Sequence, residues 1–133
     1  MGYVIGLIAA LACLGLAIPV GMTRDRAFYA TVAIIVATYY ILFATMAGDM
    51  RAVAIESAFA LVFITAAVVG FRTHLWIAVA ALFGHGVFDA MHGFLVANPG
   101  VPPWWPAFCG TFDVVAGAGL WLVLRTNKGP IIY

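Results

Sequence analysis

Charged side chains are scarce in this sequence, at 8% of 133 residues. A soluble domain carries about 25% charged residues, so the composition argues against an ordinary soluble fold. The few Lys and Arg residues form no cluster, which excludes the basic surface of a nucleic-acid-binding protein. Cysteine is also rare. Cys13 and Cys109 both lie inside apolar segments, which argues against a disulfide framework.

Hydrophobic residues, by contrast, make up 66% of the chain and gather in five long stretches. Each stretch is about twenty residues long, which a helix needs to cross a hydrocarbon core of roughly 30 Å. A helix satisfies its own backbone hydrogen bonds, so these stretches predict helices rather than barrel strands. We therefore predict an all-α fold with a single domain over residues 1–133. Its five transmembrane helices are expected at about 2–22, 27–47, 52–71, 75–97 and 104–124.

The cationic residues fall mainly on one side of these spans. One set of loops carries Arg24, Arg26, Arg72, Arg125 and Lys128. The other set carries only Arg51. Because loops rich in Lys and Arg stay in the cytoplasm, we expect the N-terminus outside and the C-terminus inside, in a bacterial inner membrane. The proline-bearing loop 98–106 then lies outside, as a rigid turn, which is the interpretation we favour, or as a lid.

Small residues recur four apart at the start of the first span, at Gly2, Gly6 and Ala10. Such a stripe lets helix backbones approach closely within a membrane. Contact inside the bundle is the favoured use of this face. Contact between the subunits of a homo-oligomer is the alternative.

Ionisable residues inside the predicted spans are Glu56, His85, Asp89, His92 and Asp113. A charged side chain at the centre of a membrane helix costs about 2.5 kcal/mol or more, so such residues indicate function. His85, Asp89 and His92 are spaced i, i+4 and i+7, which places them on one helix face. Asp113 follows Cys109 by four residues, so these two side chains also share a face.

The depth of these residues in the membrane is a second observation. At a rise of about 1.5 Å per residue, the depths below the outer ends of the spans are about 7 Å for Glu56, His92 and Cys109, about 12 to 13 Å for Asp89 and Asp113, and about 18 Å for His85. We therefore predict one polar layer in the outer half of the membrane, on the periplasmic side. Its members are Glu56, Asp89, His92 and Asp113, with His85 deeper and Cys109 at the rim.

Imidazole and carboxylate ligands suit zinc and iron, and a thiolate favours zinc. We predict one or two divalent metals, with zinc first and non-haem iron or copper next. The predicted metal ligands are His85, Asp89, His92, Asp113 and Glu56. Asp113, Glu56 and Asp89 are also the candidate general acids and bases. Two alternatives stay open: a metal-free catalytic or proton-handling cluster, and a hydrogen-bonded network that only ties the helices together.

Two kinds of function fit such a site. The favoured one is a metal-dependent membrane hydrolase or related acid–base enzyme, embedded in membrane lipid, whose amphiphilic, lipid-like substrate enters from the outer leaflet. The alternative is a permease coupled to protons or metal ions, or a metal-holding subunit of a larger complex. The fourth and fifth spans carry no charge in their cytoplasmic halves, which favours a one-sided pocket and therefore an enzyme or a binding protein.

Three motifs of the sequence resemble those of a known family. They are Glu56-Ser57-Ala58-Phe59, His85-x-x-x-Asp89-x-x-His92, and Cys109-x-x-x-Asp113 after a proline-bearing loop. In this order, over about residues 50–115, they resemble a family of small bacterial and fungal integral membrane proteins of unknown function. The resemblance implies that these residues act together, and it implies no particular reaction.

A looser likeness, by analogy alone, is to membrane zinc hydrolases of the alkaline ceramidase type, which also use His and Asp from transmembrane helices. This chain departs from them in its number of spans and lacks a matching His-x-x-x-His pair.

Overall fold

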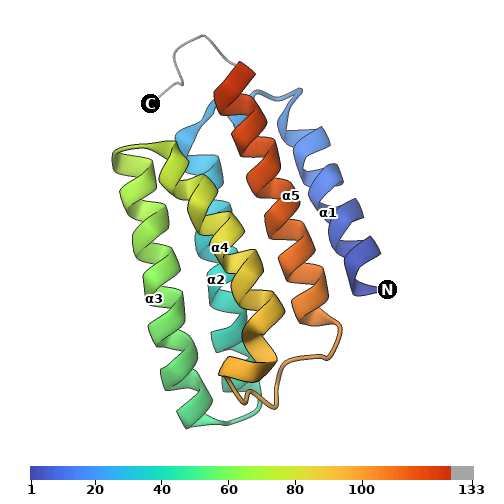
Figure 1. The fold of residues 1–133 in the computed structure, drawn as a ribbon, viewed down its shortest axis with the longest axis vertical. Coiled ribbons are helices and arrows are strands. Elements are labelled where there is room, and N and C mark those ends of the chain that lie inside the picture. The colour runs from blue at the N-terminus through green and yellow to red at the C-terminus, as the bar shows by residue number, and fades with distance from the viewer. Residues whose placement is uncertain (127–133) are drawn as a thin grey trace.

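The computed structural model describes residues 1–126 of the chain. This range folds into five α-helices and one short 3-10 helix, and it contains no strand (Figure 1). The elements are α1 (Gly2–Ala17), η1 (Met22–Arg24), α2 (Arg26–Met46), α3 (Met50–Arg72), α4 (Leu75–Leu95) and α5 (Trp105–Thr126). The predicted all-α fold is confirmed over this range. Lys128, one of the cations used to predict the orientation, lies outside the described residues.

Four of the helices, α2 to α5, are each long and apolar enough to cross a membrane. The first predicted span is shorter than expected, because α1 has 16 residues and ends at Ala17 rather than near residue 22. Pro19 contributes to this early end, since proline has no N–H group to continue the helical hydrogen bonds. Gly21 then turns the chain with a φ of 78°, which residues with a side chain rarely adopt. The structure supports a membrane-embedded bundle with four candidate spans and one shorter apolar helix.

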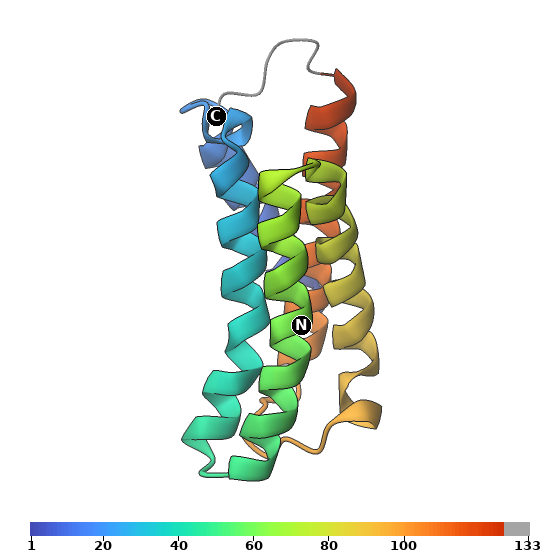
Figure 2. The same cartoon turned by 90° about the vertical axis from the view of Figure 1, so that its left-hand side faces the viewer.

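In the bundle, α2 packs on α3, α3 on α4 and α4 on α5, while α1 lies along the outer side of α5 (Figure 1 and Figure 2). Helix α1 meets α5 through the stripe of small residues. A side-chain carbon on Gly2 would lie 2.6 Å from the Trp104 carbonyl oxygen, and one on Gly6 would collide with the Phe108 carbonyl. The predicted use of this face within the bundle is therefore confirmed.

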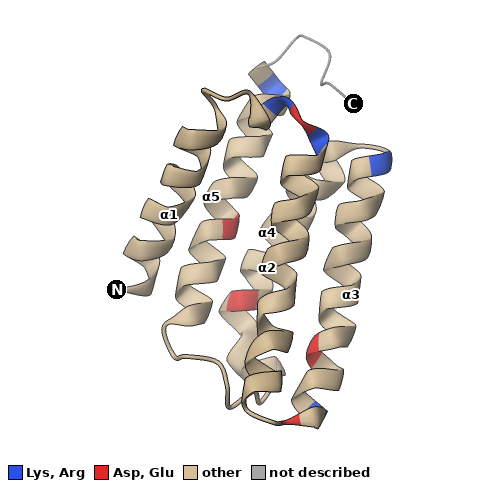
Figure 3. Cartoon of the chain, turned by 180° about the vertical axis from the view of Figure 1, so that it is seen from behind, with Lys and Arg blue, Asp and Glu red and all other residues tan. Residues whose placement is uncertain are grey.

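Side-chain hydrogen bonds fix α3 at both of its ends. The Asp49 carboxylate accepts from two backbone N–H groups at 3.0 Å, including that of Arg51, and so caps the start of the helix. The Arg26 guanidinium donates to the carbonyl oxygens of Phe71 at 2.9 Å and Thr73 at 3.0 Å, where the helix ends. Figure 3 shows most of the Lys and Arg residues at that end of the bundle. This is the distribution from which the orientation was predicted.

The interior of the bundle has an apolar half and a polar half. Near the α3–α4 turn, the apolar core contains Leu82 and Leu120, both fully buried. The other core residues are Tyr29, Ala33, Ala67, Leu75, Ala78, Val79 and Ala116. In the other half lie five buried polar side chains, each at most 3% exposed: Glu56, His85, Asp89, His92 and Asp113. All of the ionisable residues predicted to lie inside the membrane are therefore enclosed by the bundle.

Candidate metal centre

Two glycines let α4 and α5 cross closely beside the polar residues. A side-chain carbon on Gly110 would lie only 3.2 Å from the Asp89 Cβ, and one on Gly86 would lie 3.0 Å from a methyl group of Val114. Gly86 directly follows His85 in the sequence. The close crossing therefore places the His85 and Asp89 face of α4 against the polar face of α5.

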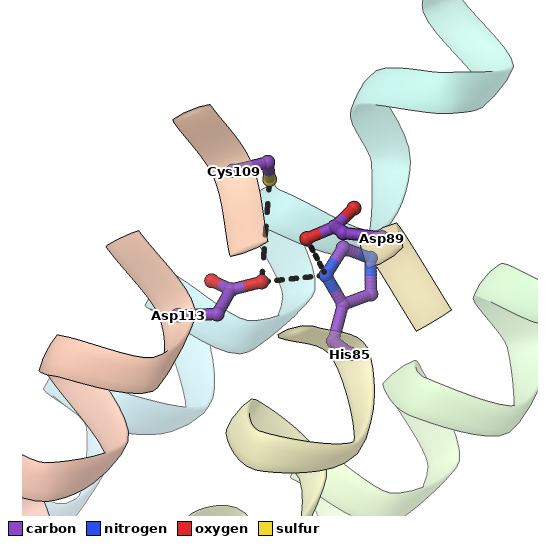
Figure 4. Close-up of side chains that lie close together, drawn as sticks. All are labelled: His85, Asp89, Cys109 and Asp113. Carbon is purple, nitrogen blue, oxygen red and sulfur yellow. Dashed lines mark hydrogen bonds and ion pairs between the residues drawn. The ribbon is translucent and has the colours of Figure 1, made fainter. Parts of the chain in front are cut away.

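The result is a compact group, here called the His85 cluster, formed by His85, Asp89, Cys109 and Asp113 (Figure 4). The His85 Nδ1 atom lies 2.6 Å from Asp113 Oδ2 and 3.5 Å from Asp89 Oδ2. The Cys109 thiol donates to Asp113 Oδ2 at 4.0 Å. Each residue offers one ligand atom, and these four atoms lie within 4.8 Å of one another. All four side chains are buried, each at most 2% exposed.

Two carboxylate oxygens of the His85 cluster lack hydrogen-bond partners. Asp89 Oδ2 and Asp113 Oδ1 are buried and accept no hydrogen bond from the described part of the chain. Asp89 Oδ2 is close to His85 Nδ1, but that nitrogen makes its short contact with Asp113 instead. A buried acceptor without a partner costs about 1–3 kcal/mol, and more when it is charged. A cation would offset that cost, and one imidazole, two carboxylates and one thiol are ligands that zinc accepts. The cluster could therefore hold a metal ion.

Tyr40, on α2, connects the His85 cluster to a second polar group. Its hydroxyl donates to Asp89 Oδ1 at 2.6 Å. Its ring stacks on that of His92, with centroids 3.9 Å apart and planes 10° apart. Tyr40 has no role in the site predicted from the sequence. Its position in the middle of an apolar span could have indicated a role, because a buried tyrosine hydroxyl needs a hydrogen-bond partner.

The second group, here called the His92 cluster, consists of Glu56, His92 and Asn98. His92 Nε2 lies 2.7 Å from Glu56 Oε1, which also accepts from the Asn98 amide at 2.9 Å. The same amide donates to the Tyr40 backbone carbonyl at 3.0 Å. The remaining oxygen of Glu56 is buried without a partner among the described residues. The His92 cluster thus joins α3, α4 and the loop after α4.

The loop after α4 is held in place by these contacts. The Asn98 side-chain oxygen accepts from the Gly100 backbone N–H at 3.1 Å, which closes a tight turn. Gly100 packs so closely on the Phe43 carbonyl of α2 that a side-chain carbon would not fit. These contacts favour the interpretation of the loop as a rigid turn rather than a lid.

The predicted polar layer is thus divided into two clusters. The structure brings His85, Asp89 and Asp113 together, and it places His92 with Glu56 instead. Cys109, expected at the rim, is only 2% exposed and belongs to the His85 cluster. Depth along each helix does not say which helices are neighbours, so it could not separate the two groups. The roles of these six residues as ligands, acids or bases stay predictions.

The donor set and its burial are therefore the basis for assigning chemistry to this chain. No protein-family model, curated protein or solved structure was found to match it.

Proposed function

We propose that this chain is an integral membrane enzyme that binds a divalent metal, zinc first, and carries out hydrolytic or acid–base chemistry on an amphiphilic substrate. In this proposal all five helices lie in an inner membrane, with the N-terminus outside and the site in the outer half. One observation carries it. Four atoms able to bind a metal, from two helices, lie within 4.8 Å of one another inside an apolar bundle.

A bound metal accounts for the His85 cluster better than a purely structural network does. A hydrogen-bonded network would leave Asp89 Oδ2 and Asp113 Oδ1 without partners in a low-dielectric interior. Serine or asparagine would tie helices together at lower cost than two carboxylates. A divalent cation neutralises both carboxylates, and the thiol of Cys109 with the imidazole of His85 favours zinc over harder metals.

Metal binding requires a small rearrangement of the His85–Asp113 pair. His85 Nδ1 and Asp113 Oδ2 are 2.6 Å apart, which is the length of a hydrogen bond. Ligand bonds of about 2.0–2.1 Å in a tetrahedral zinc site place neighbouring ligand atoms roughly 3.3 Å apart. The metal would therefore replace the proton between the two side chains. Binding should release this proton to solvent.

The acid–base step would use the carboxylates of the His85 cluster. A bound metal would lower the pKa of a water molecule that it holds. Tyr40 holds one oxygen of Asp89, which leaves the other oxygen for the metal. Asp113 has an oxygen without a partner among the described residues, and this oxygen can accept the proton. Glu56 belongs to the His92 cluster, so it would act on the site only through Tyr40 and its surroundings.

The second candidate is a metal-holding protein without catalysis. It is favoured by the presence of four protein donors, because structural zinc sites have all four positions filled by the protein. A permease is less well supported, because the apolar core that contains Leu82 and Leu120 fills the bundle on the far side of the His85 cluster.

Metal analysis of protein purified without chelator tests the proposal. We expect about one zinc per chain and the loss of that zinc in His85→Ala. Protein without stoichiometric metal would contradict the proposal. Cobalt substitution then separates the two candidates. In an enzyme, a small inhibitory anion should change the visible spectrum of the Co²⁺ protein, since catalytic sites keep an open position. In a metal-holding protein the spectrum should not respond.

A further inference from the structure

A cavity of about 470 Å³ lies against α5, between the start of α1 and the second half of α4. It is here called the α5 recess. Its lining residues are Tyr3 of α1 and others within residues 86–90 of α4 and 106–115 of α5, and the turn before α5 borders it through Pro103. Tyr3 is 69% exposed and Val114 is 43% exposed, so the recess opens to the outside of the bundle.

The α5 recess reaches the His85 cluster at Asp89. Among the described residues of its lining, Asp89 alone carries a carboxylate. This side chain is 1% exposed, and its Oδ2 atom has no hydrogen-bond partner among the described residues. The same oxygen lies 3.6 Å from the position that a side-chain carbon on Gly110 would take, and Gly110 also lines the recess. Because a glycine is there, no side chain of that residue separates the unpartnered oxygen from the recess.

The chemistry of this lining favours water over a lipid chain as the occupant of the α5 recess. A hydrocarbon chain has no hydrogen-bond donor, so it would leave the buried oxygen of Asp89 unsatisfied. A water molecule can donate to that oxygen. Thr111 offers a second acceptor, because its hydroxyl donates to the Ala107 carbonyl at 2.8 Å and its oxygen can still accept. The recess has room for several water molecules. Ionisable residues of membrane helices commonly border such water-filled cavities.

We infer that the α5 recess is filled with water and is the inlet through which water reaches the His85 cluster. In the proposed orientation the route runs from the outer surface, past Pro103 and Thr111, to Asp89 Oδ2. That oxygen lies 3.5 Å from His85 Nδ1, so the route ends among the proposed ligand atoms. This inference rests on the proposed function, because hydrolysis consumes water that the hydrocarbon core lacks. The inlet also gives a hydrated metal ion a path to side chains that are at most 2% exposed.

Radiolytic footprinting of the metal-free full chain in lipid nanodiscs tests this inference without a substitution. Hydroxyl radicals formed from water oxidise the side chains beside it, and mass spectrometry locates the oxidised residues. Val114 lines the recess, whereas Val87 is 60% exposed and does not line it. Both valines lie about two helical turns from the outer ends of their helices. We expect Val114 to be oxidised about fivefold faster than Val87 or more. Equal rates, or a faster rate at Val87, would overturn the inference.

Two cysteine variants on α4 test the same point with a reagent that dissolves in water and not in hydrocarbon, a thiosulfonate that carries a sulfonate group. In a Cys13→Ser chain, Ala90→Cys places a thiol in the recess. Met91→Cys is the matched control, since Met91 is 48% exposed, does not line the recess and lies one residue nearer the outer end of α4. We expect modification of Ala90→Cys to be about tenfold faster or more. The Cys13→Ser chain alone gives the background from Cys109. Equal rates in the two variants would contradict the inference.

Filling the α5 recess tests its link to the proposed metal. Val114→Trp should slow zinc uptake by metal-free protein about fivefold or more, without lowering the final zinc content. Val87→Trp is the control and should take up zinc within about twofold of the parent rate. Uptake at the parent rate in Val114→Trp would count against the inlet.

The inlet and the proposed function can fail separately. A chain that binds no zinc but shows fast reaction at Val114 and Ala90→Cys would refute the proposed function and support a water-filled recess. A chain that binds zinc but reacts slowly at both positions would refute the inlet alone.

Discussion

Tyr40 and His92 lie face to face, with ring centroids 3.9 Å apart, while the hydroxyl of the same tyrosine donates to Asp89 at 2.6 Å. One side chain of α2 therefore contacts both polar clusters of the bundle. Hydrogen-bonding partners of this kind fix the orientation of metal ligands and tune their affinity. Tyr40 is the natural place to test whether the two clusters work together.

Replacing Tyr40 by phenylalanine should weaken metal binding while keeping the ring contact with His92. The change removes only the hydroxyl that holds Asp89 in place. We expect zinc affinity, measured by competition with a chromophoric chelator, to fall by about 10–100-fold. Tyr39→Phe is the matched control and should leave affinity unchanged. If both variants bind zinc as the parent does, Tyr40 does not position Asp89.

The two clusters should differ in their need for metal. Asp113→Asn removes a proposed ligand from the His85 cluster, so we expect zinc affinity to fall by roughly 100-fold or more, beyond the effect of a hydrogen-bonding partner. Glu56→Gln changes the His92 cluster and should keep stoichiometric zinc. Metal analysis of both purified variants checks this. Loss of zinc from Glu56→Gln would instead support the single layer predicted from the sequence.

The close crossing of α4 and α5 should be sensitive to a single methyl group. Gly110→Ala would place a carbon 3.2 Å from the Asp89 Cβ, so Asp89 or its helix must move by a few tenths of an ångström. We expect a loss of about 1–3 kcal/mol in stability, with weaker zinc binding. Gly93→Ala is the control, because a carbon there meets no atom of residues 1–126 within 4 Å. Thermal unfolding in detergent should separate the two variants, and equal melting temperatures would argue against tight packing here.

The turn after α4 should depend on one amide. Asn98→Ala removes donors to Glu56 and to the Tyr40 carbonyl, which leaves buried acceptors unpaired at a cost of about 1–3 kcal/mol. We expect faster hydrogen exchange in residues 96–104 and lower stability. Ser57→Ala should change neither, because among the described residues the Ser57 hydroxyl bonds to a carbonyl of its own helix alone. Unchanged exchange in Asn98→Ala would show that the turn is held by other contacts.

The orientation can be tested at two loops on opposite ends of the bundle. In a chain with Cys13→Ser, a cysteine is introduced as Ala47→Cys or as Thr73→Cys, both at exposed positions. A membrane-impermeant maleimide applied to intact cells should label the first variant and not the second, since Arg-rich ends stay inside. The opposite pattern would reverse the proposed orientation.

Hydrophobic length and helix-ending residues made α2 to α5 predictable within a few residues. The same rules overestimated α1, because Pro19 and Gly21 lie inside an otherwise apolar run. At the site, helical spacing correctly put His85 and Asp89 on one face. It could not tell that Asp113 would pair with His85 rather than His92, because that choice depends on how α4 rotates against α5. The contribution of Tyr40 depends on the placement of α2, which spacing within one helix does not reveal.

The contact of α1 with α5 also constrains the order of assembly during synthesis. The glycine face at Gly2 and Gly6 is translated before α2, α3 and α4, but its partners, Trp104 just before α5 and Phe108 within it, are translated after them. Helix α1 therefore cannot make this contact until residues 104–108 have been translated. A ribosome stalled before residue 104 would leave that face open to other small-residue helices. The docking of α1 is thus a late event that follows the synthesis of α2 to α4.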